Sequence, residues 1–337
     1  MRTSVVVSML AFAALGLSGC EQMPLAYGDA NSIIAVMDPG LWNQVSDTVE
    51  DALEPTILTV ANERTFHVTY QDPTESEKWV NLRRFRQLLL VGTGKESWMQ
   101  EPLSQVHDSV TGPGLYLAKD VWSRGQEVHI LILSKPDAVD EVRQHLPDIN
   151  KILDDYYRNW VRNRMFVSGI DSALADTLMA QAGFQVVVPE VYRWRKDADS
   201  VYQFRNDNPD PSELIREVTV SWRSPIPENE TPQDLLDWRH ELTSEYYSEP
   251  QDVDLSLNDS GPFTYRGEQG YQIQAVWKNP PKLEWPAAGP FILRAVPCPQ
   301  QNRLYLLDAW LYAPNRDKYQ YMIQLETILN TFSCGTP

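Results

Sequence analysis

The stretch S-I-I-A-V-M-D-P-G-L-W, residues 32–42, decides the architecture of the first half of the chain. Its first six residues form a compact apolar run, which is typical of a strand buried in a sheet. Asp38 then offers a carboxylate for a helix N-cap, and Pro39 suits the first helical position. Apolar residues recur at helical spacing from residue 41 to residue 53. The stretch therefore predicts a strand followed directly by an amphipathic helix.

Further strand and helix patterns follow this unit along the chain. Strands are indicated at 65–70, 87–91, 114–122 and 127–133, and the last two are expected to form a hairpin. A long helical pattern begins at Pro136, and we expect Pro147 to kink or split it. We therefore predict an N-terminal α/β domain at residues 32–166, followed by a helical connection at residues 167–185.

The second half is dominated by strand patterns. They cover residues 186–194, 201–204, 218–222, 271–277, 291–296 and 304–312. One helix is predicted from Pro232, and an amphipathic helix closes the chain. This order predicts a mainly antiparallel sheet in a C-terminal α+β domain at residues 186–337. The fold class expected for the whole chain is mixed α+β, with two domains that each pack helices on a sheet.

The N-terminus carries the features of a bacterial lipoprotein signal. One arginine precedes an apolar run at residues 5–17, which is shorter than the roughly 20 residues of a membrane-spanning helix. The run ends in L-S-G-C, and this resembles the site where a thiol is acylated before cleavage. We predict a signal peptide at residues 1–19, a diacylglycerol and palmitate anchor on Cys20, and a tether at residues 20–31. Glu21 is not the aspartate that retains some lipoproteins at the inner membrane, which favours the outer membrane.

The net charge of −17 restricts the partners of the protein. Such an acidic surface repels phosphate backbones, so nucleic acid is not expected as a partner. Acidic lipid head groups are repelled as well, which leaves the acyl chains to hold the membrane. Once Cys20 is set aside, Cys298 and Cys334 remain, and an exported compartment favours one disulfide between them. Two free thiols are the alternative.

The sequence contains no recognisable catalytic motif. G-x-S-x-G is absent, and the glycines before Lys95 do not have the spacing of a phosphate-binding loop. The five histidines lack metal-ligand spacing, and His67 and His129 are expected to be half-buried structural residues of strands. The acidic residues 252–261 are interpreted as a solvated loop, because their spacing does not fit a calcium loop. We therefore predict no catalytic residues, no metal and no cofactor.

Two features are candidates for binding. The island Y-Y-R-N-W-V-R-N-R, residues 156–164, places Arg158, Arg162 and Arg164 beside aromatic residues, a combination suited to a carboxylate-bearing partner or to lipid head groups. Packing between domains is the favoured alternative, with Tyr156, Trp160 and Val161 on the buried face of a helix. Trp122 is the second candidate, because tryptophan faces suit sugar rings and peptides.

Several of these segments resemble one family. They are Val36-Met37-Asp38 with Leu41-Trp42, Lys119-Asp120-Val121-Trp122 with Gln126, Gly289-Pro290-Phe291, Ala309-Trp310-Leu311-Tyr312-Ala313-Pro314, and Gln324-Leu325-Glu326. Their order over nearly the whole chain is similar to domain of unknown function 4837, an uncharacterised lipoprotein family typical of Bacteroidota. The acidic segment 245–260 and the cysteine pair depart from that pattern. The closing strand, Tyr312-Ala313-Pro314 and helix are also similar to the α/β/α sandwich of PsbP and Mog1 proteins, which implies a binding or assembly role.

These features lead to one main hypothesis and one alternative. The main hypothesis is a non-enzymatic, lipid-anchored protein of the cell envelope that binds a protein, peptide or glycan between or beside its two domains. The alternative is an envelope hydrolase with a non-standard site of carboxylates and histidine. A concave pocket with convergent titratable groups favours the hydrolase, whereas a flat, dry, aromatic surface favours the binding protein.

Overall fold

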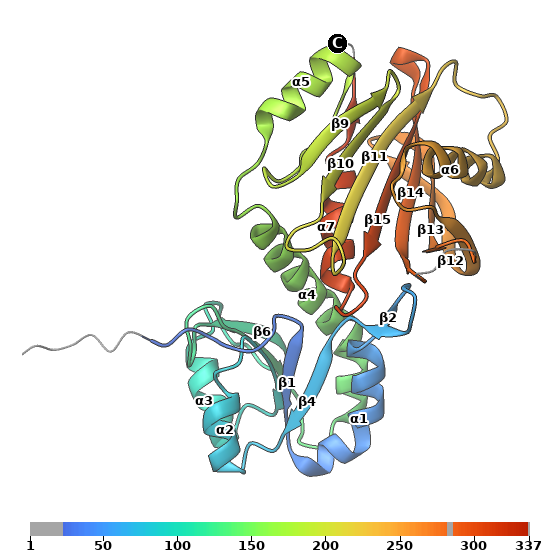
Figure 1. The fold of residues 1–337 in the computed structure, drawn as a ribbon. Helices are drawn as coiled ribbons and strands as arrows, with labels where there is room; N and C mark the ends of the chain where they lie inside the picture. The colour runs from blue at the N-terminus through green and yellow to red at the C-terminus, as the bar shows by residue number, and fades with distance from the viewer. Residues whose placement is uncertain (1–22, 282–285, 336–337) are drawn as a thin grey trace, which may run out of the picture.

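The computed structural model describes residues 23–281 and 286–335 and places them in two sheets with helices packed on both (Figure 1). The N-terminal half forms a five-stranded sheet and the C-terminal half a seven-stranded, antiparallel one. The predicted mixed α+β class is thus confirmed. No helix in the described part of the chain combines the length and apolar character needed to cross a bilayer. The predicted signal peptide at residues 1–19 and the predicted lipid anchor at Cys20 lie outside the described residues.

The N-terminal sheet has the strand order β4-β1-β5-β7-β6, and all its neighbouring strands are parallel except β6 and β7. Its strands are β1 (Ser32–Val36), β4 (His67–Gln71), β5 (Gln87–Gly92), β6 (Gly114–Lys119) and β7 (Glu127–Ile132). Two helices, α1 (Pro39–Leu53) and α4 (Val139–Met165), cover one face, and α2 (Ser76–Leu82) and α3 (Ser97–Ser104) cover the other. Because both faces are covered, β1, β5 and β7 are apolar almost throughout.

The predicted N-cap of α1 is confirmed. Oδ1 of Asp38 accepts hydrogen bonds from the backbone N–H groups of Gly40 at 2.7 Å and Leu41 at 3.3 Å. These two donors have no partner inside the helix, so the carboxylate satisfies them where the chain turns from β1 into α1.

Pro147 does not split the long helix, because α4 is continuous through it and is 27 residues long. Leu146 and Ile149, on either side of the proline, are both buried in one apolar stripe against α1 and the sheet. This continuous packing outweighs the single backbone hydrogen bond that a proline removes. The helix therefore reaches from the smaller sheet to the larger one (Figure 1).

The C-terminal sheet has the order β12-β13-β14-β15-β11-β10-β9. Its strands are β9 (Arg193–Ala198), β10 (Val201–Asn206), β11 (Ile215–Arg223), β12 (Asp252–Tyr265), β13 (Glu268–Lys278), β14 (Ala288–Cys298) and β15 (Arg303–Tyr312). The acidic segment interpreted as a loop is the edge strand β12, paired with β13 and bulged between Asp254 and Asn258. An edge strand exposes much of its surface, so its charged side chains stay in water while its backbone pairs.

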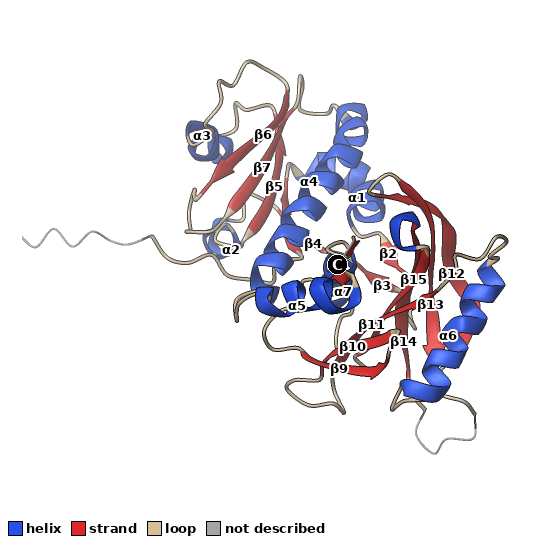
Figure 2. Cartoon of the chain, turned by 90° about the horizontal axis from the view of Figure 1, so that it is seen from above, coloured by secondary structure: helices blue, strands red, loops and turns tan. Residues whose placement is uncertain are grey.

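Helices cover both faces of this sheet (Figure 2). The outer face carries α6 (Pro232–Tyr246), and the opposite face carries α5 (Ser172–Ala182) and α7 (Tyr319–Leu329). Leu174 and Leu178 of α5 are buried in the C-terminal core. The segment 167–185, predicted as a helical connection, contains α5, and this helix packs in the C-terminal layer.

Short strands complete the fold. They are β2 (Thr56–Ile57), β3 (Glu63–Arg64), β8 (Phe184–Gln185) and β16 (Ser333–Cys334), with a short 3₁₀ helix at Pro299–Gln301. A disulfide joins Cys298, at the end of β14, to Cys334, the pair expected from the cysteine count. It fastens the end of the described chain to the large sheet.

Part of the predicted tether at residues 20–31 is packed against the N-terminal sheet. The Ala26 N–H donates to the Arg124 carbonyl at 3.0 Å, and the Arg86 N–H donates to the Tyr27 carbonyl at 2.9 Å. Tyr27 also packs edge-on against Phe85, with ring centroids 4.7 Å apart. The N-terminal domain therefore begins earlier in the chain than the sequence pattern indicates.

Candidate functional site

The two halves of the molecule meet at α7. Tyr319 and Ile323, near its start, are buried in the N-terminal core together with α1 and α4. Leu325 and Ile328, further along, are buried in the C-terminal core. One helix therefore contributes to both cores, and the junction between the halves is built around its first two turns.

Glu63 of β3 caps this helix from the N-terminal domain. Its carboxylate accepts hydrogen bonds from the backbone N–H of Lys318 and from that of Tyr319, the latter at 3.0 Å. The Lys318 ammonium lies 3.4 Å from the same carboxylate. A negative group suits the positive end of a helix dipole and satisfies donors that lack helical partners. The cap of a helix in one domain is thus supplied by the other.

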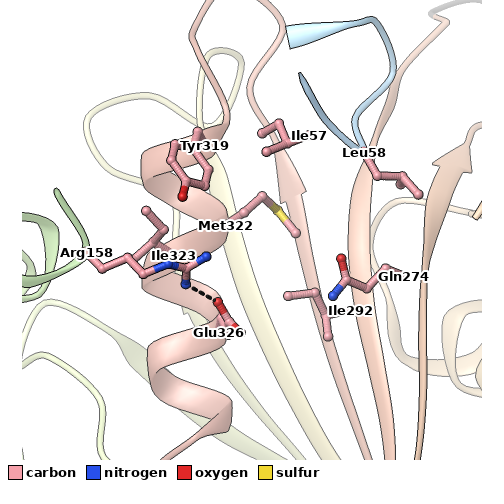
Figure 3. A pocket seen from close by; sticks show the side chains of 9 residues that line it. All are labelled: Ile57, Leu58, Arg158, Gln274, Ile292, Tyr319, Met322, Ile323 and Glu326. Carbon is pink, nitrogen blue, oxygen red and sulfur yellow. Dashed lines mark hydrogen bonds and ion pairs between the residues drawn. The ribbon is translucent and has the colours of Figure 1, made fainter. Parts of the chain in front are cut away.

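Arg158 makes a second link across the junction. Its guanidinium lies 2.7 Å from Asp154 on the same helix, α4. It also lies 2.7 Å from Glu326 on α7 (Figure 3). The Tyr319 hydroxyl donates a hydrogen bond to Asp154. Burial, together with this carboxylate, raises the pKa of Tyr319. The predicted binding residue Arg158 is therefore engaged in domain packing, which is the alternative that the sequence favoured.

A gap of about 140 Å³ lies beside this ion pair (Figure 3). It is lined by Ile57, Leu58, Arg158, Gln274, Ile292, Tyr319, Met322, Ile323 and Glu326. The charged groups in its wall are paired with each other, and the rest of the wall is mostly apolar. We interpret this gap as imperfect packing between the domains rather than as a ligand site.

A larger opening, which we call the junction hollow, lies at the same junction. Its volume is about 350 Å³. It is lined by Asp29, Ala30, Asn31, His67, Tyr157, Trp160, Arg316, Asp317, Gln320 and Tyr321. These residues come from the segment just before β1, the start of β4, the second half of α4, and the segment that leads into α7 together with its first residues. Four separate segments therefore converge on one polar cavity, at the kind of place where ligand sites are common.

Tyr157 forms part of the wall of the junction hollow. It stacks with Trp160 at a centroid distance of 6.0 Å and with Tyr319 at 5.5 Å, so a row of three rings crosses the junction. Only 4% of Tyr157 is exposed, and its hydroxyl makes no hydrogen bond to any described residue. Burial, followed by the Asp317 and Asp29 carboxylates, raises the pKa of Tyr157. The phenol therefore stays protonated and can still form hydrogen bonds.

The charged groups of the junction hollow are only partly engaged. Arg316 pairs with Glu213 at 2.8 Å. Neither Asp29 nor Asp317 has a cationic partner within 4.0 Å among the described residues. His67, expected to be half-buried, is exposed at the first position of an edge strand, where the sheet leaves one flank open. In the described residues, no three histidine, cysteine or acidic side chains are grouped in a way that could hold a metal ion.

The structure does not bring the four predicted binding residues together. Arg162 donates to Asn159 at 2.9 Å, and Arg164 lies over the Trp160 ring at 4.9 Å, so both remain on α4 near the junction. Trp122 packs at the opposite face of the N-terminal sheet. Its indole N–H donates to Glu101 at 2.7 Å.

Trp122 and the three arginines are therefore separated by the smaller sheet. Tyr157, rather than the predicted Tyr156, occupies the buried face of α4. The residues of the junction hollow lie far apart in the sequence and form no local motif. Sequence patterns therefore carried no signal that could have grouped them.

A second polar cluster lies under α6. Arg239 and Asp308 are fully buried, with the guanidinium Nε 3.0 Å from Oδ2 of the carboxylate. The Tyr247 hydroxyl donates to the same oxygen at 2.7 Å. Nearby Glu217 is buried against Arg205, and burial raises the pKa of Glu217 to about 7. This cluster is enclosed by α6 and the sheet, so we assign it to the core.

Comparisons with known proteins identify the two halves separately. The model of domain of unknown function DUF4837 matches residues 171–331. The C-terminal half of the chain is thus similar to the DUF4837 family. A different model, DUF8532, also a domain of unknown function, matches residues 26–165. The predicted family is therefore confirmed. The prediction that the resemblance covers nearly the whole chain is wrong, because the segments quoted from residues 36–42 and 119–126 lie in the part that matches DUF8532.

Solved structures give only weak likenesses to part of the chain. The Ran-binding protein Mog1p of Saccharomyces cerevisiae is 11% identical with a TM-score of 0.32, and the match covers 46% of this chain and 91% of that one. The cyanobacterial PsbP protein of Synechocystis is 13% identical with a TM-score of 0.30, covering 45% and 87%. At these scores neither likeness informs the function. No curated protein sequence matches the chain.

Proposed function

We propose that this protein is a lipid-anchored, non-enzymatic binding protein of the bacterial cell envelope, and that the junction hollow is its binding site. The observation that carries the binding role is the convergence of four segments on an open polar cavity at the domain junction. The proposed localisation at the membrane rests on the signal pattern at residues 5–20. Neither argument depends on the other.

The membrane localisation is tested by the substitution Cys20→Ala in the full-length chain. We expect the variant to lose membrane association and to lack the mass of the acyl chains, because the sulfur atom is the point of attachment. Fractionation and intact-mass measurement provide the readout. An unchanged mass and unchanged membrane association would refute the anchor.

The binding role is tested by photo-cross-linking in the native envelope. A photoreactive residue at Gln320, in the wall of the junction hollow, is compared with one at Asp176, exposed on α5. We expect an adduct from position 320 and none from position 176. Equal labelling from both positions would contradict a site at the junction.

The hydrolase remains the second candidate because Asp29, His67 and Asp317 line the same cavity. Carboxylates and histidine are the usual general acids and bases. However, the wall of the junction hollow contains no serine, cysteine or threonine as a nucleophile. Turnover of a bound compound would favour the hydrolase if Asp317→Asn abolishes that turnover. Binding of a compound without turnover favours the binding protein.

A further inference from the structure

The hydrogen-bonding groups of the junction hollow have a mixed character. Asp29 and Asp317 only accept, whereas Arg316 only donates and is already paired with Glu213. Other groups can do both: the Asn31 and Gln320 amides and the Tyr157 hydroxyl. A ligand that matches this wall must itself both donate and accept, which is the property of a hydroxyl group.

Charged ligands fit this wall less well. Two carboxylates without a cationic partner repel a phosphate or carboxylate ligand. The positive end of the α7 dipole could attract an anion, but Glu63 already caps it. A compact cation cannot use the Trp160 ring as a cation–π partner, because Arg164 already lies over that ring at 4.9 Å. The surroundings therefore favour a neutral ligand.

The aromatic residues supply the remaining part of the match. Tyr157, Trp160 and Tyr321 all line the junction hollow. A sugar ring has one apolar face of C–H groups, which packs on aromatic rings, and a rim of hydroxyls, which needs donors and acceptors together. The volume of about 350 Å³ is at the lower end of the range for ligand pockets. This size suits a monosaccharide or disaccharide unit.

We propose that the junction hollow binds a neutral carbohydrate, with the Tyr157 hydroxyl and the Asp317 carboxylate as hydrogen-bonding groups and the aromatic wall as the packing surface. This inference rests on the proposed binding function and names its ligand class. The hydroxyl of Tyr157 is suited to the role because the residue lines the junction hollow, and the phenol is protonated and makes no hydrogen bond to the described residues. A sugar hydroxyl in the junction hollow would form a direct hydrogen bond with it.

The experiment uses the full-length protein in a detergent without a sugar head group. Calorimetric titration with glucose, N-acetylglucosamine, maltose and cellobiose is compared with titration with cadaverine, succinate and a neutral dipeptide. We expect at least one of the sugars to bind and the two charged probes not to bind. Tyr157→Phe should weaken sugar binding about fivefold, the effect of one lost hydrogen bond.

Two further variants make the test specific. Asp317→Asn removes a charged acceptor of nearly the same shape and should weaken sugar binding about tenfold. Tyr271→Phe removes a hydroxyl from the wall of another cavity and should leave sugar binding unchanged. Circular dichroism of each variant verifies that the fold is retained.

The outcomes separate the ligand class from the function. The protein could bind no sugar but bind cadaverine, succinate or the dipeptide. If Tyr157→Phe weakens that binding, the carbohydrate inference is overturned and the junction hollow is retained as a binding site. Sugar binding that neither Tyr157→Phe nor Asp317→Asn changes overturns the inference and the site together. The absence of binding by every probe also counts against both.

Discussion

His129 shows at the residue scale how burial changes chemistry. It lies in β7 at the middle of the N-terminal sheet, and only 2% of it is exposed. Burial, with a smaller contribution from the charge of Lys119, lowers the pKa of His129 to about 4. Its Nε2 has no hydrogen-bond partner among the described residues. The sequence predicted a half-buried structural histidine, and the structure encloses it completely.

His129 should make the fold less stable in mild acid. Between about pH 6.5 and pH 4 the unfolded histidine takes up a proton that the folded one does not, so stability falls as the pH falls. The expected loss is about 1.4 kcal/mol per pH unit and about 3 kcal/mol in total. In His129→Leu this loss should be absent, as measured by urea unfolding at pH 7, 6 and 5.

The comparison must be made between variants at each pH, because Glu217 titrates in an overlapping window with the opposite sign. Its pKa is raised to about 7, so the folded state binds the extra proton and stability falls as the pH rises. His107→Leu, at a fully exposed histidine, is the control and should keep the wild-type dependence. An identical pH dependence for His129→Leu and the wild type would contradict the argument.

At the scale of elements, α6 is fixed to the sheet by the buried pair of Arg239 and Asp308. Removal of one partner leaves the other charge buried without compensation. Arg239→Met should therefore lower the free energy of unfolding by about 3–5 kcal/mol. Arg239→Met combined with Asp308→Leu should recover a large part of the loss, because neither charge then needs a partner.

Urea unfolding at pH 7 measures both variants. Lys151→Met, which breaks the exposed pair with Asp155, is the control and should cost less than about 1 kcal/mol. A double variant as unstable as Arg239→Met alone would show that the buried charge of Asp308 is not the cause of the loss.

At the scale of the whole molecule, α7 couples the two halves because it is buried in both cores. The Glu63 cap holds its first turn from the N-terminal side. Glu63→Ala should lower the free energy of unfolding by about 1–2 kcal/mol and speed hydrogen exchange of the Lys318 and Tyr319 amides. Glu228→Ala, at an exposed loop carboxylate, is the control and should leave exchange in α7 unchanged.

The same coupling predicts how the halves unfold. We expect tryptophan fluorescence and far-ultraviolet circular dichroism to report one common transition in the wild-type protein, since disorder of α7 exposes both cores. Glu63→Ala and Arg158→Ala together should separate the transitions, because the cap and the ion pair to Glu326 are both lost. Well-separated transitions in the wild type would contradict the coupling.

The sequence by itself determined most of the elements, the fold class, the cap at Asp38 and the partner of Cys298. These features depend on local periodicity, capping chemistry and the number of cysteines, all of which are present in a short stretch or in a simple count. The continuity of α4 through Pro147 escaped prediction because distant packing overrode a local preference. The same cause explains why the acidic segment became an edge strand.

Only the tertiary structure decided where the domains meet and what lies between them. Asp29, His67, Tyr157 and Asp317 belong to different segments of the chain, and no spacing in the sequence relates them. They converge because α4 reaches past the first sheet and α7 returns from the second, so that one helix buries side chains in two cores. A local pattern indicates which face of a helix is apolar, but the burial of that face against particular partners depends on the whole fold.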